Sequence, residues 1–252
     1  FALLGSILYL VGTALLYGSY ATLDIVLLSR RIHPEPATLV AATLMTIGLF
    51  AKTALFPLHL WLPPAHAGAP AAASAVLSAV VVKGSFFLVV RLWFDVMPGM
   101  LGSAGAQLFG ALGAAAIIFG SVVALQQQRL KLLIAYSTVA QIGYLFLIFP
   151  LALDASAQLQ GSGALTGGIV QAISHATAKA AMFMAAGLIY AALGHDRIAE
   201  LGGVARALPM TIFAFALGGV SLIGLPPSGG FLAKWILLQA TVATGQWWWA
   251  LV

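Results

Sequence analysis

The sequence predicts an all-α protein, a polytopic bundle of transmembrane helices with interruptions in some of its spans. Of the 252 residues, 62% are hydrophobic and only 7% are charged, and the mean hydropathy is +1.06. A soluble domain carries about 25% charged residues, so this composition indicates a membrane protein. Apolar segments of about 20 residues, the length that crosses a bilayer as a helix, recur along the chain. The connections between them are short and hold most of the charges.

The length criterion predicts seven complete spans and the start of an eighth. They cover residues 1–23, 37–57, 71–94, 105–125, 132–153, 164–193 and 209–240, with the partial span from 247. Lysine and arginine are spread almost evenly over alternate connections, so the positive-inside rule does not fix the orientation. Because the chain opens within an apolar pattern and ends in an aromatic run, we expect it to be a piece of a longer membrane protein.

Proline and glycine interrupt the apolar pattern at two places, FAKTALFPLHLWLPPAHAGAP and SLIGLPPSGGFLAKWILL. Proline removes a backbone donor and clashes with the preceding turn, so we expect helix breaks at residues 57–64 and 224–230. Irregular backbone at membrane depth persists only where protein buries it or where it lines a wet cavity. Paired breaks in two halves of a chain are typical of inverted-repeat transporters. For the first site, a plain loop between two spans is the alternative.

Four of the five lysines lie in or beside these apolar segments: Lys52, Lys83, Lys179 and Lys234. A charged lysine at mid-bilayer costs roughly 2.5–3.5 kcal/mol even on the mildest scale. Four of them would cost on the order of 10 kcal/mol unless they pair, lose their charge or face water. A passive membrane anchor would not keep such residues, and the lysines are therefore the first candidates for function.

Buried lysines are suited to carrying protons. Low dielectric disfavours the ammonium form, which helps the amine to release its proton, and it strengthens the repulsion between neighbouring charges. His175 precedes Lys179 by four residues and therefore shares its helix face, and its ordinary pKa of about 6.5 fits a relay between lysine and water. Lys83 and Lys179 lie near the centres of their spans, too deep to reach the membrane surface.

Other basic residues have simpler interpretations. Lys131 and Arg91 lie near helix ends, where a long side chain reaches the interface while its stem stays in apolar surroundings. We expect His59 and His66, in the proline-rich connection, to lie at the interface.

Several classes of function are disfavoured by the residue inventory. The chain has no cysteine, which removes disulfides, thiolate metal sites and cysteine-ligated iron–sulfur clusters. No acidic residue lies deep in a span to serve as the counter-ion of a retinal Schiff base, and His175 is the one intramembrane histidine, so a bis-histidine haem is not expected. The basic residues are scattered, which argues against nucleic acid. We therefore expect no cofactor and no metal, and a lysine and histidine proton path remains.

At these residues the chain resembles the antiporter-type membrane subunits shared by complex I (NADH:quinone oxidoreductase), Mrp-type cation/proton antiporters and membrane-bound hydrogenases. Besides the two interrupted stretches, the resemblance lies in VVVKGSFFLVVRL, QRLKLLIAYSTVAQIGYLFL, ISHATAKAAMFMAAGLIY and HDRIAELGGVARALP. These motifs follow one another over nearly the whole chain. The context of Lys83 is most similar to the D-type antiporter subunits. One complex I member has glutamate where this chain has Lys234, which argues against that member.

The resemblance implies two inverted five-helix units. Residues 1–104 would be the C-terminal part of the first unit, with three spans, and residues 105–252 the second, with four spans and a truncated fifth. Lys52 would be the lysine of the first broken helix, whose glutamate partner would lie upstream of Phe1. Lys83 would lie on the central axis, and Lys234 on the second broken helix. His175 and Lys179 would occupy the helix that bridges the two halves.

The function implied is that of a proton-translocating subunit without its own redox centre, driven by redox chemistry elsewhere in a complex or by exchange against a cation. Its partners would be other membrane subunits, protons and the lipid bilayer, and whether sodium moves is left open. The location implied is a bacterial inner membrane. We expect Lys52, Lys83, His175, Lys179 and Lys234 to form one polar axis. The alternative is a non-conducting scaffold whose lysines hold helices together through backbone carbonyls.

Overall fold

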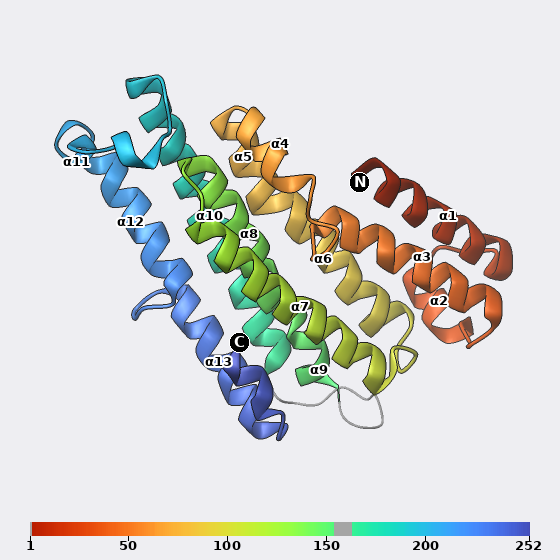
Figure 1. The fold of residues 1–252 in the computed structure, drawn as a ribbon. Coiled ribbons are helices and arrows are strands. Elements are labelled where there is room, and N and C mark those ends of the chain that lie inside the picture. Colours follow the sequence, from red (N-terminus) through yellow and green to blue (C-terminus); the bar gives the residue numbers. More distant parts are fainter. Residues whose placement is uncertain (1, 154–162) are drawn as a thin grey trace.

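The computed structural model describes residues 2–153 and 163–252, which form an all-helical bundle (Figure 1). Within these described residues, six helices are long and apolar enough to cross a membrane. They are α1 (Ala2–Tyr20), α3 (Pro36–Thr53), the helix Ala71–Val96, α7 (Gly102–Leu125), the helix Leu130–Ala152 and α10 (Ala164–Leu193). The multi-pass membrane class predicted from composition is thereby confirmed.

The seventh predicted span, residues 209–240, consists of two shorter apolar helices, α12 (Pro209–Ile223) and α13 (Gly229–Ala243). Figure 1 shows them almost in line along one edge of the bundle, with a loop between them. The start of an eighth span at Trp247 is a single 3-10 segment, η4 (Trp247–Leu251). The remaining short elements are α2 (Ile25–Arg31), α4 (Leu62–Gly68), η3 (Ile198–Glu200) and α11 (Val204–Ala207).

The first interruption exists, but it begins earlier than the prolines predict. Helix α3 ends at Thr53, where Ala54 takes a left-handed conformation with φ of 57°, and the chain turns until α4 begins at Leu62. Pro63 and Pro64 lie in the first turn of α4, where a backbone N–H has no helical partner to lose. The expected break at residues 57–64 is therefore corrected to 54–61.

The second interruption agrees with the prediction and is shorter than expected. Gly224, with φ of 87°, ends α12, and the Ser228 side chain caps α13 by accepting from the Phe231 N–H. A Cβ at Gly230 would collide with the Ser221 carbonyl, so α13 begins as close to α12 as glycine permits. Only residues 224–228 are non-helical, because Gly229 and Gly230 already belong to α13.

The helix that carries Lys83 is not uniform, which the sequence does not predict. Between Ala71 and Val96 it alternates α5 (Ala71–Val76), the π segment η1 (Leu77–Val81), α6 (Val82–Val90) and the π segment η2 (Arg91–Val96). Such π segments within α-helices occur often at functional sites. Here, η1 directly precedes the turn that holds Lys83.

Helix α8 (Leu130–Phe146), continued by α9 (Ile148–Ala152), lies inside the bundle. It packs against α7, α10 and α4, and its span is the most buried of the six. Edge-to-face contacts join Phe50 of α3 to Phe109 of α7 and Phe146 of α8, with ring centroids 4.8 and 5.2 Å apart. Helix α8 therefore sits where it can contact residues from both halves of the chain.

Candidate functional site

Lys179 of α10 is fully buried, with 0% exposure. Its Nζ donates to the Ile134 carbonyl over 2.8 Å and to the Ser137 hydroxyl over 2.5 Å, both on α8. Hydrogen bonds from an ammonium to oxygen are roughly twice as strong as neutral ones, so they offset part of the loss of hydration. Lys179, one of the two lysines predicted near the centre of a span, thus lies in the interior between two helices.

Lys83 is also buried, with 8% exposure. Its Nζ donates to the carbonyl of Ser78, which lies in the π segment η1 of the same helix. The Ser78 hydroxyl in turn shares a 3.2 Å hydrogen bond with the Thr138 hydroxyl of α8. Contacts through Ser78 therefore connect Lys83 to the same turn of α8 that holds Lys179.

Lys234 follows the second interruption and is half-buried. Its Nζ donates to the carbonyls of Leu222 and Ile223, at 3.1 and 3.2 Å, and lies 4.6 Å from the ring centroid of Tyr144. The last carbonyls of a helix have no partner within the helix, and the negative end of its dipole favours a cation. Because the chain breaks at Gly224, these carbonyls at the end of α12 are available to Lys234.

His175 lies on α10 between Gln171 and Lys179, one helical turn from each, and all three are buried. Neither ring nitrogen of His175 has a hydrogen-bond partner among the described residues. Gln171 donates to the side-chain oxygen of Gln141 on α8 over 2.8 Å, and Gln141 donates to the Leu222 carbonyl over 3.2 Å. That carbonyl also accepts from Lys234, so a hydrogen-bonded connection runs from α10 to the second break.

Lys52 occupies a different position. It lies at the end of α3, beside the first break, and is half-buried. Its side chain passes close to α1, since a Cβ on Gly5 would lie 3.5 Å from the Lys52 Cγ. Within residues 2–153 and 163–252 it forms no hydrogen bond or ion pair with the other four candidate residues. The structure thus connects Lys83, Lys179 and Lys234 through α8, places His175 beside Lys179, and leaves Lys52 apart.

Two histidines expected at the interface are buried. His59 and His66 are 3% and 0% exposed, and His66 stacks on Phe183 of α10 with ring centroids 4.4 Å apart. Their position follows from the break itself, because the turn at residues 54–61 folds the connection back into the bundle. A proline-rich connection does not by itself indicate that its histidines are buried, because their burial depends on which helices pack around it.

The sequence analysis missed two further features, the burial of Lys131 and a polar stripe on α8. Lys131 is 8% exposed, and its Nζ donates to the Ala69 carbonyl over 3.1 Å instead of reaching outward. Ser137, Thr138 and Gln141 were not singled out, although they form a polar stripe at helical spacing within an apolar span. Polar residues at this spacing within an apolar span indicate one polar face of the helix, and that pattern could have identified them.

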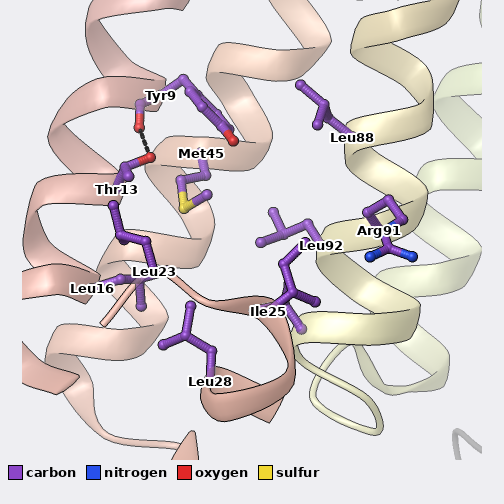
Figure 2. Close-up of a pocket in the computed structure, with 11 residues that line it drawn as sticks. Tyr9, Thr13, Leu16, Leu23, Ile25, Leu28, Met45, Leu88, Arg91 and Leu92 are labelled. Carbon is purple, nitrogen blue, oxygen red and sulfur yellow. Dashed lines mark hydrogen bonds between the residues drawn. The ribbon is translucent and has the colours of Figure 1, made fainter. Parts of the chain in front are cut away.

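The cavity in Figure 2 is separate from these residues. It measures about 260 Å³ and lies among α1, α2, α3 and the helix that carries Lys83. Its walls are mainly leucine and other apolar side chains, with Thr13 bonded to the Tyr9 carbonyl and Arg91 at its margin. Arg91 is paired with Asp95 at 2.9 Å. None of the five candidate residues lines this cavity, which argues against its belonging to a proton path.

Known proteins resemble this chain over nearly its whole length. The family described as "NADH:quinone oxidoreductase/Mrp antiporter, TM" matches residues 1–252. NADH-quinone oxidoreductase subunit N of Desulforudis audaxviator is 36% identical over 243 residues, covering 95% of this chain and 47% of the relative. A Na(+)/H(+) antiporter subunit of Alkalihalophilus pseudofirmus is 37% identical over 253 residues, covering 95% of this chain and 30% of the relative.

Solved structures show the same arrangement of helices. A chain of the Mrp complex from a Dietzia species superposes with a TM-score of 0.88 at 30% identity, covering 99% of this chain and 45% of that one. A chain of respiratory complex I from Thermus thermophilus superposes with a TM-score of 0.86 at 24% identity, which shows the shared fold, and covers 100% of this chain and 52% of that one. The chain spans half or less of the length of the two relatives named here.

Proposed function

The chain belongs to the NADH:quinone oxidoreductase/Mrp antiporter membrane family, and on that premise we propose that the full-length protein is a proton-translocating subunit of a multi-subunit membrane complex. Protons would move along an axis formed by Lys52, Lys83, His175, Lys179 and Lys234, of which Lys83, His175 and Lys179 are buried. The relatives bear the names of a quinone oxidoreductase component and a sodium/proton antiporter component, which supports this class of activity.

The observation that carries the proposal is the linkage of three lysines through one helix. Lys83, Lys179 and Lys234 come from different helices, and hydrogen bonds connect each of them to α8, directly or through one intermediate residue. In the part of the chain that the structure describes, no ion pair involves a lysine. Buried lysines without carboxylate partners are free to exchange protons, because no fixed negative charge holds them in the ammonium form.

We propose that the protein lies in a bacterial inner membrane, with other membrane subunits of its complex as partners and sodium as the candidate for a second cargo. Residues 1–104 and 105–252 would be parts of two inverted five-helix units. The interruptions at residues 54–61 and 224–228, each close to a lysine, support this division.

One observation favours the alternative of a non-conducting scaffold subunit. Lys179 and Lys234 donate to carbonyls of a neighbouring helix, and such contacts hold helices together. Lys83 does not fit that role, because its carbonyl partner lies in its own helix.

The deciding experiment replaces Lys179 with alanine in the full-length protein within its complex. After reconstitution into liposomes, proton flux is measured with a pH-sensitive dye, and assembly is followed by purification. The proposal expects loss of flux from an assembled complex. A scaffold role expects weakened assembly, while whatever complex does assemble conducts as the parent does.

A further inference from the structure

Among the described residues, Ser137 of α8 is the side chain that hydrogen-bonds the amine of Lys179. Its hydroxyl lies 2.5 Å from the Lys179 Nζ and 3.0 Å from the Ile134 carbonyl, which itself lies 2.8 Å from the same Nζ. The three groups therefore form a closed triangle of hydrogen-bond partners. Among the described residues, these two oxygens are the hydrogen-bond partners of the lysine.

The two oxygens differ in what they can do. A carbonyl only accepts hydrogen bonds, so the Ile134 carbonyl suits the ammonium form of the lysine. A hydroxyl accepts and donates, and its hydrogen rotates to suit its neighbour. Ser137 can accept from the ammonium while its own hydrogen points to the Ile134 carbonyl. After the lysine loses a proton, that hydrogen can turn to the lone pair of the amine.

We propose that Ser137 is a positioning residue that serves Lys179 in both of its protonation states. A buried proton carrier needs a partner in each state, because an unsatisfied buried polar group is costly. On proton transfer, the Nζ–H bond of Lys179 breaks and the proton passes to the next carrier of the path. The serine keeps its proton and only rotates it. The inference rests on the proposed function, since it presumes that Lys179 changes its protonation state.

The neighbouring hydroxyl, that of Thr138, is linked to Lys83 through Ser78. Thr138 follows Ser137 in the sequence and is therefore turned by about 100° around the helix axis. Its hydroxyl contacts Ser78, whose carbonyl holds Lys83, and it also donates to the Ile134 carbonyl over 3.0 Å. Of these two adjacent residues of α8, Ser137 contacts the amine of Lys179 directly, whereas Thr138 is linked to Lys83 only through Ser78.

The test compares Ser137→Thr, Ser137→Cys and Ser137→Ala in the full-length protein within its complex, reconstituted into liposomes. Proton flux is driven by an imposed pH gradient and followed with a trapped dye. Ser137 is half-buried, so the extra methyl of threonine can be accommodated. The matched control is Ser85→Ala, because the Ser85 side chain is buried and, among the described residues, its hydroxyl bonds to the Val81 carbonyl of its own helix and to no lysine.

We expect flux to follow hydrogen-bonding capacity. The threonine variant should stay within about twofold of the parent, and the alanine variant should fall about tenfold, the equivalent of one lost hydrogen bond. Cysteine, close to serine in size but a weak donor, should fall between them. The Ser85→Ala control should conduct normally. If the alanine variant does not assemble, the comparison of proton flux between the threonine and cysteine variants still tests the inference.

Two results would overturn the inference. One is normal flux in an assembled Ser137→Ala complex, and the other is a cysteine variant that conducts as well as the parent, which would indicate that size alone matters. The Lys179→Ala variant separates this from failure of the proposed function. If Lys179→Ala blocks flux and Ser137→Ala does not, only the role of Ser137 is wrong. If Lys179→Ala conducts normally, the proton path itself is wrong.

Discussion

Gln171 of α10 donates a 2.8 Å hydrogen bond to Gln141 of α8, at the level where α8 also reaches the second helix break. Gln141 passes the connection on to the Leu222 carbonyl, which accepts from Lys234. Unlike the amine of a lysine, a side-chain amide does not readily give up and regain a proton. The two glutamines are therefore better suited to fixing the geometry between α10 and α12 than to carrying protons between Lys179 and Lys234.

Replacing Gln141 with leucine should destabilise the protein. Gln171 is 1% exposed, so its amide would lose a partner in the interior at a cost of about 1–3 kcal/mol. The measurement is thermal unfolding in detergent. The matched control is the double variant Gln141→Leu with Gln171→Leu, which removes both amides and should recover part of the lost stability. An unchanged melting temperature in the single variant would show that this contact contributes nothing.

Replacing Lys83 with alanine should abolish proton flux while the complex still assembles. The change removes a protonatable group, but it also relieves the cost of burying a charge, so stability should change little. Lys83→Arg should fail too, because arginine stays protonated and cannot release a proton. Both variants are measured as flux in reconstituted vesicles, with assembly followed by purification. Normal flux from an assembled Lys83→Ala complex would remove this residue from the path and favour the scaffold interpretation.

Replacing Asp196 with alanine should loosen the connection between α8 and the segment after α10. The Asp196 side chain is 3% exposed and accepts from the Arg129 side chain at 2.9 Å and from the Lys131 backbone N–H at 3.3 Å. Its loss should cost about 1–3 kcal/mol of stability. Glu200→Ala is the control, since the Arg197–Glu200 pair is exposed and should contribute less than about 1 kcal/mol. Unfolding in denaturant compares the two, and equal effects would contradict the distinction.

Replacing Gly143 with alanine should separate α7 from α8. A Cβ there would collide with the Gly113 carbonyl and lie 2.6 Å from the Ile117 Cγ1. Close helix packing through small residues stabilises membrane bundles, and overpacking costs about 1–3 kcal/mol. The control is Gly219→Ala in α12, where a Cβ meets nothing within 4 Å and alanine is the better helix former. The melting temperature should fall for Gly143→Ala and hold or rise for Gly219→Ala.

Much of the fold could be predicted from the sequence because the length of each span and the position of a helix break depend on local residue composition. Apolar length marks each span, and the Gly-Leu-Pro-Pro run that ends at Pro227 stops a helix because proline cannot continue one. The first break was misplaced because Pro63 and Pro64 are compatible with the start of a helix, whereas the left-handed turn at Ala54 leaves no signal of that strength in the sequence. The boundaries between inverted units stay a prediction.

The sequence by itself determined the membrane class, the existence of the interrupted helices and which lysines belong to apolar segments, because hydropathy and helix-breaking residues depend only on residue type and spacing. The tertiary structure decided what those lysines contact. It placed Ser137 beside Lys179, the Ser78 carbonyl beside Lys83, and the end of α12 beside Lys234. These partners depend on how each helix is rotated and which helix packs beside it. That information arises only when the spans assemble around α8.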